Sequence, residues 1–391
     1  MEQGSTQDVI VVGAGAFGAS AALELRRRGH RVTLIDPGPL PHSSAASTDI
    51  SKVIRMDYGA DEFYMELMEQ ALQGWDAWNQ AWEQPLYHQT GVLLLAAGEL
   101  AAGQFEGDSH ALLQRRGHAP ERMTAKTLAG RFPAWNAQAY PDGYFNSRGG
   151  WAESGEVVAQ LIAEAKLLGV AVRAGEPVNE LLEQGGRTVG VRTGGGREYR
   201  ADWVVAAAGA WSPHLLPELA DFMGVVGQPV LHFLVDDPAA YQPPHFVVWT
   251  ADVANTGWYG FPALSDGTLK IANHGPGRPI HPDAPRQVAP EEEGRFRDFL
   301  RHALPGLAEA PVIATRLCLY CDTWDGDFWI DRHPQRPGLV VATGGSGHGF
   351  KFTPVLGPII ADVVEGKPNR FAARFAWRER GEIRTEEARH S

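Results

Sequence analysis

Cysteine is scarce in this chain, which excludes a disulfide framework. Only Cys318 and Cys321 occur among its 391 residues, and their C-x-x-C spacing fits a redox disulfide or half of a zinc site. Zinc would need further ligands at a matching spacing, and the sequence has no second C-x-x-C and no H-x-x-x-H. A thioredoxin-like pair needs a helix N-terminus, whereas residues 314–323 predict a strand. We therefore expect no metal and no redox disulfide.

Long apolar runs and excess positive charge are also missing. No stretch approaches the ~20 apolar residues needed to cross a bilayer, and the formal net charge of -12 argues against nucleic acid or an anionic membrane as partner. The first residues are acidic and polar and lead directly into an apolar strand, so we expect no signal peptide and a cytoplasmic location. The length suffices for two connected domains with large cores.

A glycine-rich turn follows the first apolar run. The run Val9–Val12 is unbroken, as expected of a strand buried on both faces of a parallel sheet. Gly13 permits a sharp turn, Gly15 lets the backbone approach a pyrophosphate, and Gly18 lets the next helix pack against the sheet. The amides at the N-terminus of that helix would then face the phosphates.

The residues after this turn complete a βαβ unit. They predict a helix over 19–28, ended by Gly29, and a strand over 31–35. Asp36 follows that strand, where a carboxylate can accept hydrogen bonds from ribose hydroxyls. The pattern predicts dinucleotide binding, and a glycine-rich turn that binds nothing is the alternative.

A second glycine-rich segment lies near the other end of the chain. Gly344–Gly349 follows the apolar run 339–343, and a further buried strand, from Trp203, ends on Gly209. A strand that ends on glycine allows close backbone approach to a ligand. Two such loops at opposite ends of the chain indicate one large cofactor held from both sides, and the simplest candidate is FAD.

The middle of the chain alternates between two patterns. Helical spacing predicts helices over 61–82, 157–168 and 291–304, and residues 188–201 predict a hairpin around three glycines. Alternation between 229 and 330 predicts an antiparallel sheet, with strands over 230–235, 245–249, 257–261 and 267–274. The charged tail after Arg374 predicts a surface helix that frays.

These patterns predict an α/β fold with an α+β second domain. We expect a Rossmann-like FAD-binding domain and an interleaved substrate domain with an antiparallel sheet. The FAD-binding domain would comprise residues 1–90, 150–215 and 331–375. The substrate domain would comprise 91–149 and 216–330, and 376–391 would form the charged tail.

Five motifs together carry a resemblance to a known family. They are VVGAGAFG from Val11, DISKVIRMDYG from Asp49, GFP…LKIANH from Gly260, RLCLYCDTWDGDF from Arg316 and GGSGHGFKF from Gly344. With these, the chain resembles the amine-oxidising flavoenzymes related to monomeric sarcosine oxidase. That family includes N-methyltryptophan oxidase, pipecolate oxidase and the fructosyl amino acid oxidases (amadoriases), and the resemblance covers nearly the full length. It implies the fold of the D-amino acid oxidase-like flavoproteins.

The resemblance implies a role for one cysteine. Cys318 matches the family position that carries FAD covalently through its sulfur, and Cys321 would then be a packing residue. The alternative for Cys318 is a small buried apolar side chain.

The resemblance also implies the catalytic residues. Lys270 matches the lysine over the flavin face where dioxygen reacts, since a cation in a dry site stabilises superoxide. A solvated strand lysine is the alternative. His274 matches an active-site histidine, for which a structural role is equally compatible.

Arg55 and Lys351 match the family's carboxylate-binding pair, which would fix an amino acid so that its C–H bond points at the flavin. A surface ion pair with Asp57 is the alternative for Arg55. Lys52 departs from sarcosine oxidase, which has arginine there, and agrees with the Ser-Lys-x-x-Arg pattern of amadoriases.

Aromatic residues complete the expected pocket. Tyr259 and Tyr320 match aromatic residues that line it, or else belong to the core. Four tryptophans would roof the pocket or only pack the sheet: Trp249, Trp258, Trp324 and Trp329. The remaining expected cofactor contacts are Ala16, Phe17, Ser43, Ser44, Lys52, Val178, Trp211, Gly345, Gly347, His348, Gly349 and Lys351.

These observations lead to one expected function. It is flavin-dependent oxidation of a secondary amino acid, N-alkyl or N-fructosyl, to an imine, with reduction of dioxygen to hydrogen peroxide. The partners would be the small substrate and dioxygen, and the protein a monomer or small homo-oligomer. One alternative is an amino or imino acid dehydrogenase that uses a quinone or an electron-transfer protein, and another is the flavin subunit of a larger oxidoreductase complex.

Overall fold

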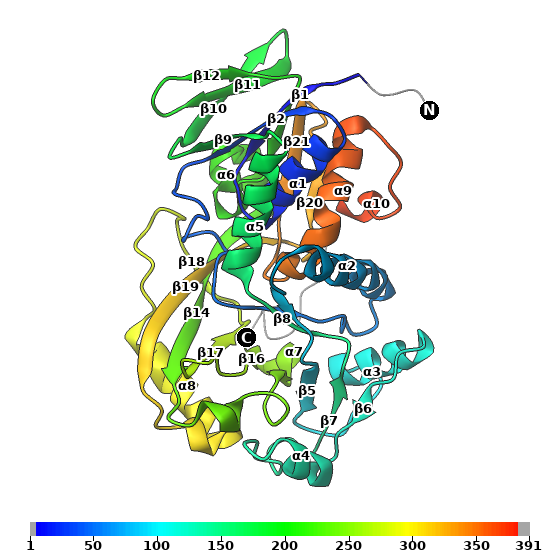
Figure 1. Cartoon of the computed structure of the whole chain (residues 1–391), viewed down its shortest axis with the longest axis vertical. Helices are drawn as coiled ribbons and strands as arrows, with labels where there is room; N and C mark the ends of the chain where they lie inside the picture. Colours follow the sequence, from blue (N-terminus) through cyan, green and yellow to red (C-terminus); the bar gives the residue numbers. More distant parts are fainter. Residues whose placement is uncertain (1–4, 382–391) are drawn as a thin grey trace.

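A largely parallel sheet joins segments from both ends of the chain in the computed structural model, which describes residues 5–381. The strand order is β20-β21-β13-β1-β2-β9, and only the β20–β21 pair is antiparallel. The strands are β1 (Asp8–Val12), β2 (Arg31–Asp36), β9 (Ala171–Ala174), β13 (Trp203–Ala206), β20 (Trp329–Arg332) and β21 (Leu339–Thr343). This is the predicted parallel sheet, in the upper half of Figure 1.

Alternate residues of β1 pack on opposite faces of this sheet. Val9 and Val11 share a core with three helices, α1 (Ala16–Arg27), α5 (Ser154–Leu167) and α9 (Thr353–Glu365). Ile10 and Val12 contact a core that includes a small antiparallel sheet. Its strands are β10 (Val178–Gln184), β11 (Arg187–Thr193) and β12 (Glu198–Arg200), of which the last two form the predicted hairpin. Because successive side chains of a strand point to opposite faces, a wholly apolar strand is covered on both.

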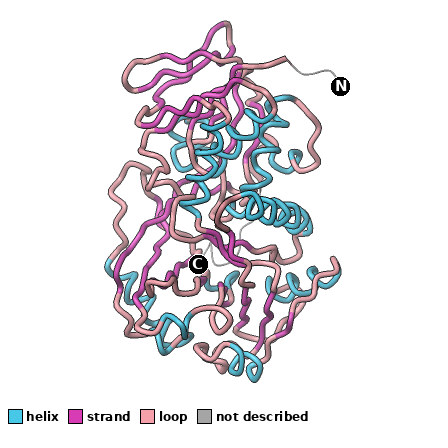
Figure 2. Tube along the Cα trace, in the orientation of Figure 1, coloured by secondary structure: helices cyan, strands magenta, loops and turns pink. Residues whose placement is uncertain are grey.

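The second large sheet is mixed rather than purely antiparallel. The strands expected between 229 and 330 form, but β5 pairs parallel with β15 and brings residues of 91–149 into the same sheet. Its strands are β5 (Val92–Ala96), β6 (Glu121–Arg122), β7 (Asp142–Asn146), β14 (Met223–Leu234), β15 (Val248–Ala251), β16 (Trp258–Gly260), β17 (Thr268–Asn273), β18 (Arg278–Pro279) and β19 (Val312–Thr323). Figure 2 shows these strands as a second magenta group below the first.

Helices surround this sheet and the region between the two sheets. The helix α2 (Glu62–Ala81) has the predicted amphipathic spacing, and the carboxylate of Asp61 caps it by accepting from the Tyr64 amide at 3.2 Å. It lies beside a small sheet of β3 (Lys52–Ile54), β8 (Gly150–Ala152) and β4 (Tyr87–His88) (Figure 1). The other helices are α3 (Phe105–Arg115), α4 (Ala125–Arg131), α6 (Ser212–Leu215), α7 (Val253–Thr256), α8 (Pro290–Ala303) and α10 (Ala372–Phe375). Between residues 5 and 381, none of the helices is long and apolar enough to cross a membrane.

The predicted fraying helix after Arg374 is wrong for the residues that the structure describes. Helix α10 ends at Phe375, and residues 376–381 are not helical. Trp377 packs edge-on against Trp329 with ring centroids 5.3 Å apart, and the Arg378 guanidinium forms two hydrogen bonds to Asp325 at 2.6 and 2.7 Å. These contacts fix the segment against the fold, which a count of charged residues cannot reveal. Residues 382–391 lie outside the described part.

Gly18 gives a direct test of the packing at the first turn. A Cβ at this position would lie 1.8 Å from the carbonyl oxygen of Gly13, so the backbone of the turn would have to move. We expect Gly18→Ala to lower the free energy of unfolding by about 1–3 kcal/mol, measured by urea denaturation. Gly130 in α4 has no atom within 4 Å of a built Cβ, so Gly130→Ala should leave stability unchanged or raise it by up to about 1 kcal/mol. Equal destabilisation by both variants would contradict this account.

Candidate active site

Two adjoining cavities lie between the sheets. The larger measures about 960 Å³ and is bounded by the turn after β1 and by the loop after β21. The smaller measures about 440 Å³. Residues that line both cavities mark where they meet, and they are Lys52, Tyr320, Ser346, Gly347 and Phe350. A ligand in the larger cavity would therefore contact a second ligand in the smaller one.

The glycines of the first turn have the expected roles. Gly13 adopts a φ of +99°, and a Cβ there would lie 2.4 Å from the carbonyl oxygen of Ala207, directly after the neighbouring strand β13. Gly15 caps helix α1 and lines the larger cavity together with the first residues of that helix. Gly18 lies away from the cavity lining and allows the helix to pack on the turn. The N-terminus of α1 is thus presented to the larger cavity, as phosphate binding requires.

Asp36 reaches the same cavity from the end of β2. Its carboxylate accepts hydrogen bonds from the amides of Ala14 at 2.8 Å and Gly38 at 3.0 Å. These bonds fix the carboxylate at the cavity wall, where it can accept further bonds from a ribose. This is the position that the sequence pattern predicted.

The second glycine-rich loop forms the opposite wall. Gly347 has a φ of +73°, and a Cβ there would lie 2.4 Å from the ring of Tyr320. A Cβ on Gly349 would lie 2.9 Å from the ring of Phe17. Larger residues at either position would displace the aromatic side chains that shape the cavities. The two loops therefore bound a cavity of about 960 Å³, a size and lining that fit a large dinucleotide such as FAD.

Most of the expected cofactor contacts surround the larger cavity. Those that line it are Gly13, Gly15, Ala16, Phe17, Asp36, Ser44, Lys52, Val178, Gly209, Trp211, Gly345, Gly347 and Gly349. Gly18, Ser43 and Cys318 are outside this lining, and His348 and Lys351 line only the smaller cavity.

Sequence reasoning missed a loop that covers the larger cavity. Pro282, Asp283 and Arg286 line it, and the Arg286 guanidinium lies 5.2 Å from the ring centre of Trp211. The Trp211 indole N–H donates to Asp283 at 2.7 Å. No periodicity or glycine pattern marked this loop in the sequence.

Lys270 forms a buried ion pair that the sequence did not indicate. Its ammonium is 2.6 Å from Asp49 Oδ2, donates to the Ser51 carbonyl oxygen at 2.6 Å, and lies 4.7 Å from the ring centre of Phe261. Lys270 is 1% exposed and lines neither cavity. Asp49 belongs to one of the quoted motifs and lies three residues before Lys52. Nothing in the sequence indicated that its carboxylate pairs with Lys270.

Burial and charge act against each other in this pair. Burial lowers the pKa of Lys270 to about 8, and the charge of Asp49 opposes that shift. Burial alone would raise the pKa of Asp49, but the charges of Lys270, Lys52 and Arg316 hold it well below the usual range. Both partners are therefore charged at neutral pH, and Lys270 loses its proton as the pH rises through about 8.

The two cysteines occupy different surroundings. Cys318 is buried beside Tyr320 and Ala272, and its sulfur is 3.8 Å from the Lys52 ammonium. Cys321 lies 3.5 Å from the sulfur of Met223, and burial raises the pKa of its thiol to about 12. Since the residues are three apart on β19, their side chains point to opposite faces. Both cysteines carry free thiols.

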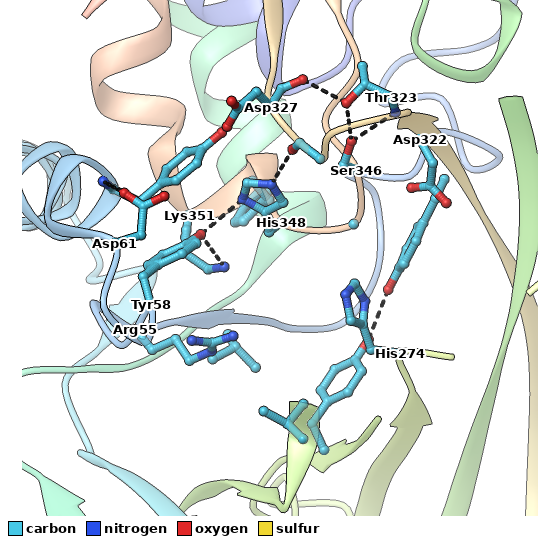
Figure 3. A pocket seen from close by; sticks show the side chains of 18 of the residues that line it. Arg55, Tyr58, Asp61, His274, Asp322, Thr323, Asp327, Ser346, His348 and Lys351 are labelled. Carbon is cyan, nitrogen blue, oxygen red and sulfur yellow. Dashed lines mark hydrogen bonds between the residues drawn. The ribbon is translucent and has the colours of Figure 1, made fainter. Parts of the chain in front are cut away.

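One side of the smaller cavity is cationic. Arg55 follows β3, and its guanidinium lies 5.3 Å and 5.4 Å from the ring centres of Phe105 and Tyr58. The Lys351 ammonium donates to the Tyr58 hydroxyl at 3.0 Å. Figure 3 shows Arg55 and Lys351 on one side of the cavity and His274 on the other. The two cations that were predicted to bind a carboxylate thus line one wall of a cavity of substrate size.

The other side is aromatic. Tyr259 from β16 and Tyr320 from β19 approach with their hydroxyl oxygens 3.5 Å apart, and the rings of Tyr320 and His274 are 5.6 Å apart. Burial raises the pKa of Tyr259, against the opposing charge of Lys52. All three of these residues line the smaller cavity, as expected.

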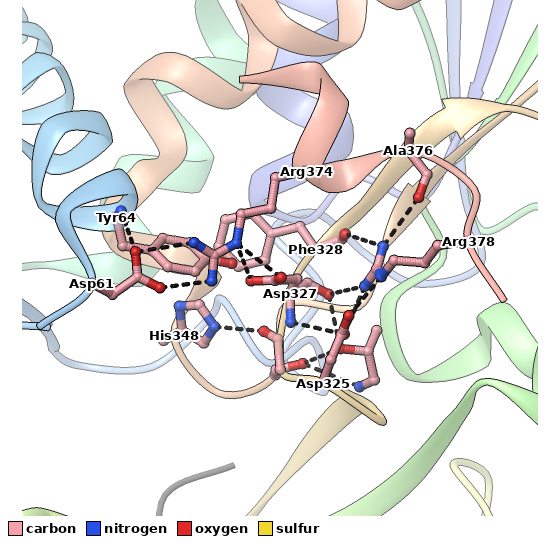
Figure 4. A network of polar contacts seen from close by, with 12 residues as sticks. Asp61, Tyr64, Asp325, Asp327, Phe328, His348, Arg374, Ala376 and Arg378 are labelled. Atoms are coloured by element: carbon pink, nitrogen blue, oxygen red, sulfur yellow. Dashed lines mark hydrogen bonds and ion pairs between the residues drawn. The ribbon is translucent and has the colours of Figure 1, made fainter. Parts of the chain in front are cut away.

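A third part of the lining of the smaller cavity, here called the far wall, contains acidic residues and an arginine. Arg374 of α10 pairs with Asp61 at 2.6 Å and with Asp327 at 2.9 Å (Figure 4). Asp322 and Asp325 also line this wall. Sequence reasoning missed this group and Tyr58, although Tyr58 lies within a quoted motif.

The tryptophans expected above the pocket pack the sheets instead. Trp249, Trp258, Trp324 and Trp329 are all absent from the lining of both cavities. Trp249 and Trp258 stack on Phe299, with ring centroids 5.7 and 4.4 Å apart. Of the two interpretations left open by the sequence, the packing role is confirmed for Trp249, Trp258 and Trp329, which belong to the buried cores. Trp324 is half-buried in the turn after β19, with its ring centre 6.0 Å from the Arg378 guanidinium.

Comparison with known proteins gives consistent matches over nearly the whole chain. A family described as FAD dependent oxidoreductase matches residues 8–363. Monomeric sarcosine oxidase of Bacillus sp. (strain NS-129) is 30% identical over 367 residues, which cover 91% of this chain and 92% of that protein. N-methyl-L-tryptophan oxidase of Salmonella heidelberg (strain SL476) is 31% identical over 370 residues, covering 93% and 96%.

Solved structures give the same picture. Fructosyl amine: oxygen oxidoreductase (Amadoriase I) from Aspergillus fumigatus has a TM-score of 0.82 at 28% identity, covering 97% of this chain and 90% of that one. Fructosyl peptide oxidase from E. terrenum has a TM-score of 0.85 at 22% identity, covering 99% and 95%. The second similarity concerns the fold alone.

The Asp49–Lys270 pair predicts a specific titration. In protein labelled with ¹³C at the lysine ε-carbons, one signal should titrate near pH 8 and disappear in Lys270→Met. Asp49→Asn should shift this titration to lower pH, because the charge that favours the ammonium is removed. The matched control is Asp142→Asn, which removes a buried carboxylate paired with Arg122 at 2.5 Å outside both cavities and should leave the titration unchanged. A Lys270 signal that does not titrate between pH 7 and 9 would contradict the prediction.

Proposed function

Because this chain belongs to the family of FAD-dependent oxidoreductases, which matches residues 8–363, we propose that it oxidises an N-substituted amino acid to an imine. The observation that carries this proposal is the meeting of a dinucleotide-sized cavity with a smaller one that presents Arg55 and Lys351. FAD, when bound, supplies the acceptor for the hydride equivalent removed from the carbon–nitrogen unit. The imine is then hydrolysed by water.

Arg55 and Lys351 would orient the substrate by its carboxylate. Arginine offers a planar fork of donors and lysine a point charge, and together they fix both the position and the tilt of a carboxylate. Holding the substrate in this way places its C–H bond at the junction of the cavities, where Tyr320 and Phe350 exclude water.

The charge of the cavity would also keep the substrate amine neutral. Lys52, Arg55 and Lys351 all line the space around it, and like charges disfavour a bound ammonium. Of the carboxylates in the same lining, those of Asp61, Asp325 and Asp327 are paired with arginines. A neutral nitrogen can release its electron pair as the C–H bond breaks. We therefore assign no general base among the residues of the cavity.

The relatives and the far wall together indicate the substrate class. Sarcosine, N-methyl-L-tryptophan and fructosyl amines, which give the matched proteins their names, are all secondary amines. The far wall here carries Asp322, Thr323, Asp325 and Ser346, which can accept hydrogen bonds from hydroxyls. This favours a polyhydroxylated N-substituent over a methyl group, and Lys52 agrees with the amadoriase pattern.

The family resemblance of Lys270, rather than its place in the structure, favours dioxygen as the electron acceptor, because Lys270 lines neither cavity and pairs with Asp49. The buried charge of Lys270 would stabilise the negative charge that develops on dioxygen as electrons arrive, giving hydrogen peroxide. Use of a quinone or an electron-transfer protein remains the alternative, and it would make the Lys270 charge irrelevant to flavin reoxidation.

The substrate is tested by anaerobic bleaching of the flavin absorbance. We expect fructosyl-valine or fructosyl-lysine to bleach the flavin at least about tenfold faster than sarcosine or N-methyl-tryptophan, because one or two added hydrogen bonds are worth about 1.4 kcal/mol. Pipecolate and proline complete the panel. Fast bleaching by sarcosine would reverse this ranking, and no bleaching by any secondary amine would overturn the proposed function.

The acceptor is tested by Lys270→Met. We expect this variant to be reduced by substrate nearly as fast as the wild type but to react with dioxygen at least about 100-fold more slowly. In the wild type, the reaction with dioxygen should slow as the pH rises through about 8, since Lys270 then loses its proton. Equal rates for both enzymes would favour the alternative acceptor.

The two cysteines allow a matched test of covalent attachment. We propose that FAD is bound to Cys318, whose buried thiol lies 3.8 Å from the ammonium of Lys52, a residue that lines both cavities. Acid-precipitated wild type and Cys321→Ser should remain yellow, whereas Cys318→Ser should give a colourless pellet with the flavin in the supernatant. A colourless wild-type pellet would make Cys318 a packing residue.

A further inference from the structure

A chain of hydrogen bonds begins at Lys351 and leads away from the smaller cavity. The Lys351 ammonium donates to the Tyr58 hydroxyl at 3.0 Å, and that hydroxyl is 3.0 Å from His348 Nδ1. His348 Nε2 lies 2.9 Å from the carbonyl oxygen of Gly326. Figure 3 shows Tyr58 between Lys351 and His348.

The direction of every bond in this chain follows from its last member. A carbonyl oxygen only accepts hydrogen bonds, so His348 must carry its proton on Nε2. With a neutral imidazole, Nδ1 accepts and the Tyr58 hydroxyl donates to it. The lone pairs of the Tyr58 oxygen consequently face the Lys351 ammonium.

The position of Gly326 depends in turn on the C-terminal segment. Gly326 lies in the turn between β19 and β20 with a φ of +77°. Arg378 makes two hydrogen bonds to Asp325, and Arg374 joins Asp327 to Asp61 at the start of α2. Figure 4 shows Arg374 beside Asp327 and Arg378 beside Asp325, with the residues of the turn between the two arginines.

The ring of Tyr58 is fixed from α2 as well. It stacks on Tyr64 with ring centroids 4.9 Å apart and an interplanar angle of 17°. The hydroxyl therefore has little freedom to follow Lys351 if that side chain moves. A lysine side chain has considerable conformational entropy, and a fixed acceptor reduces the part of this entropy that is lost when a carboxylate binds.

We propose that Tyr58 and His348 are positioning residues that hold the Lys351 ammonium in place for the substrate carboxylate, and we call this hydrogen-bond chain the relay. Arg378 and Arg374 fix the far end of the relay because they hold the turn that contains Gly326. This inference rests on the proposed role of Lys351 in the function above. It gives His348 a role at the substrate rather than at the cofactor, and it gives the C-terminal segment a role in substrate affinity.

The primary test is Tyr58→Phe in the holoenzyme. We expect the KM for the best amino acid substrate to rise about tenfold, the usual effect of losing a hydrogen bond to a charged group. The factor by which KM rises should be larger than any factor by which kcat falls. In a Lys351→Met background the same substitution should add no further change, because the group that it positions is gone. An unchanged KM in Tyr58→Phe, or independent effects of the two substitutions, would overturn the relay.

The C-terminal link is tested with a matched pair of arginines. Arg378→Ala should raise the KM at least about threefold, because the turn at Gly326 loses one of its two clamps. Arg370 lies in the same segment and pairs with Glu66 at 2.6 Å, away from the turn. Arg370→Ala should leave the KM unchanged, so equal effects of the two substitutions would contradict the link.

A readout that needs no substrate separates this proposal from the proposed function. In ¹⁵N-histidine-labelled holoenzyme, the His348 signals, assigned with His348→Gln, should show the proton on Nε2. A proton on Nδ1 would overturn the relay even if secondary amines are oxidised. If none is oxidised, the proposed function fails while the Nε2 proton still supports the hydrogen-bond chain.

Discussion

Parallel pairing of β13 with both β1 and β21 is the constraint on which the site depends. These strands come from opposite ends and the middle of the chain, and each is followed by glycine-containing backbone. Because parallel strands end at the same edge of a sheet, Gly13, Gly209 and Gly345 are all placed on the wall of the larger cavity. Packing on both faces holds that edge: helices cover one face, and the β10–β12 sheet contributes to covering the other.

The second constraint is electrostatic. Lys52, Lys270 and Lys351 are all largely buried near the junction of the cavities, and burying uncompensated charge is costly. Asp49 compensates two of these lysines, at 2.6 Å from Lys270 and 3.8 Å from Lys52. Lys351 donates to the Tyr58 hydroxyl.

The C-terminal segment, residues 370–381, connects helix α2 with the turn between β19 and β20 beside the smaller cavity. Arg374 joins α2 to the turn between β19 and β20, and Trp377 packs on β20. That turn also supplies the acceptor for His348. Substrate affinity and the anchoring of this segment would therefore be linked, although the segment contains no residue with an evident catalytic character.

The sequence by itself determined the βαβ unit, the second glycine-rich loop and the alternating strands, because glycine spacing and apolar periodicity are local. Motif resemblance identified Arg55, Lys351, Tyr259 and Tyr320, which the tertiary structure brings to one cavity. Only the tertiary structure decided that Asp49 pairs with Lys270, that Tyr58 faces Lys351 and that the tryptophans pack the sheets. Such contacts join residues up to hundreds of positions apart, and no local pattern records which distant side chain will occupy the space beside a given one.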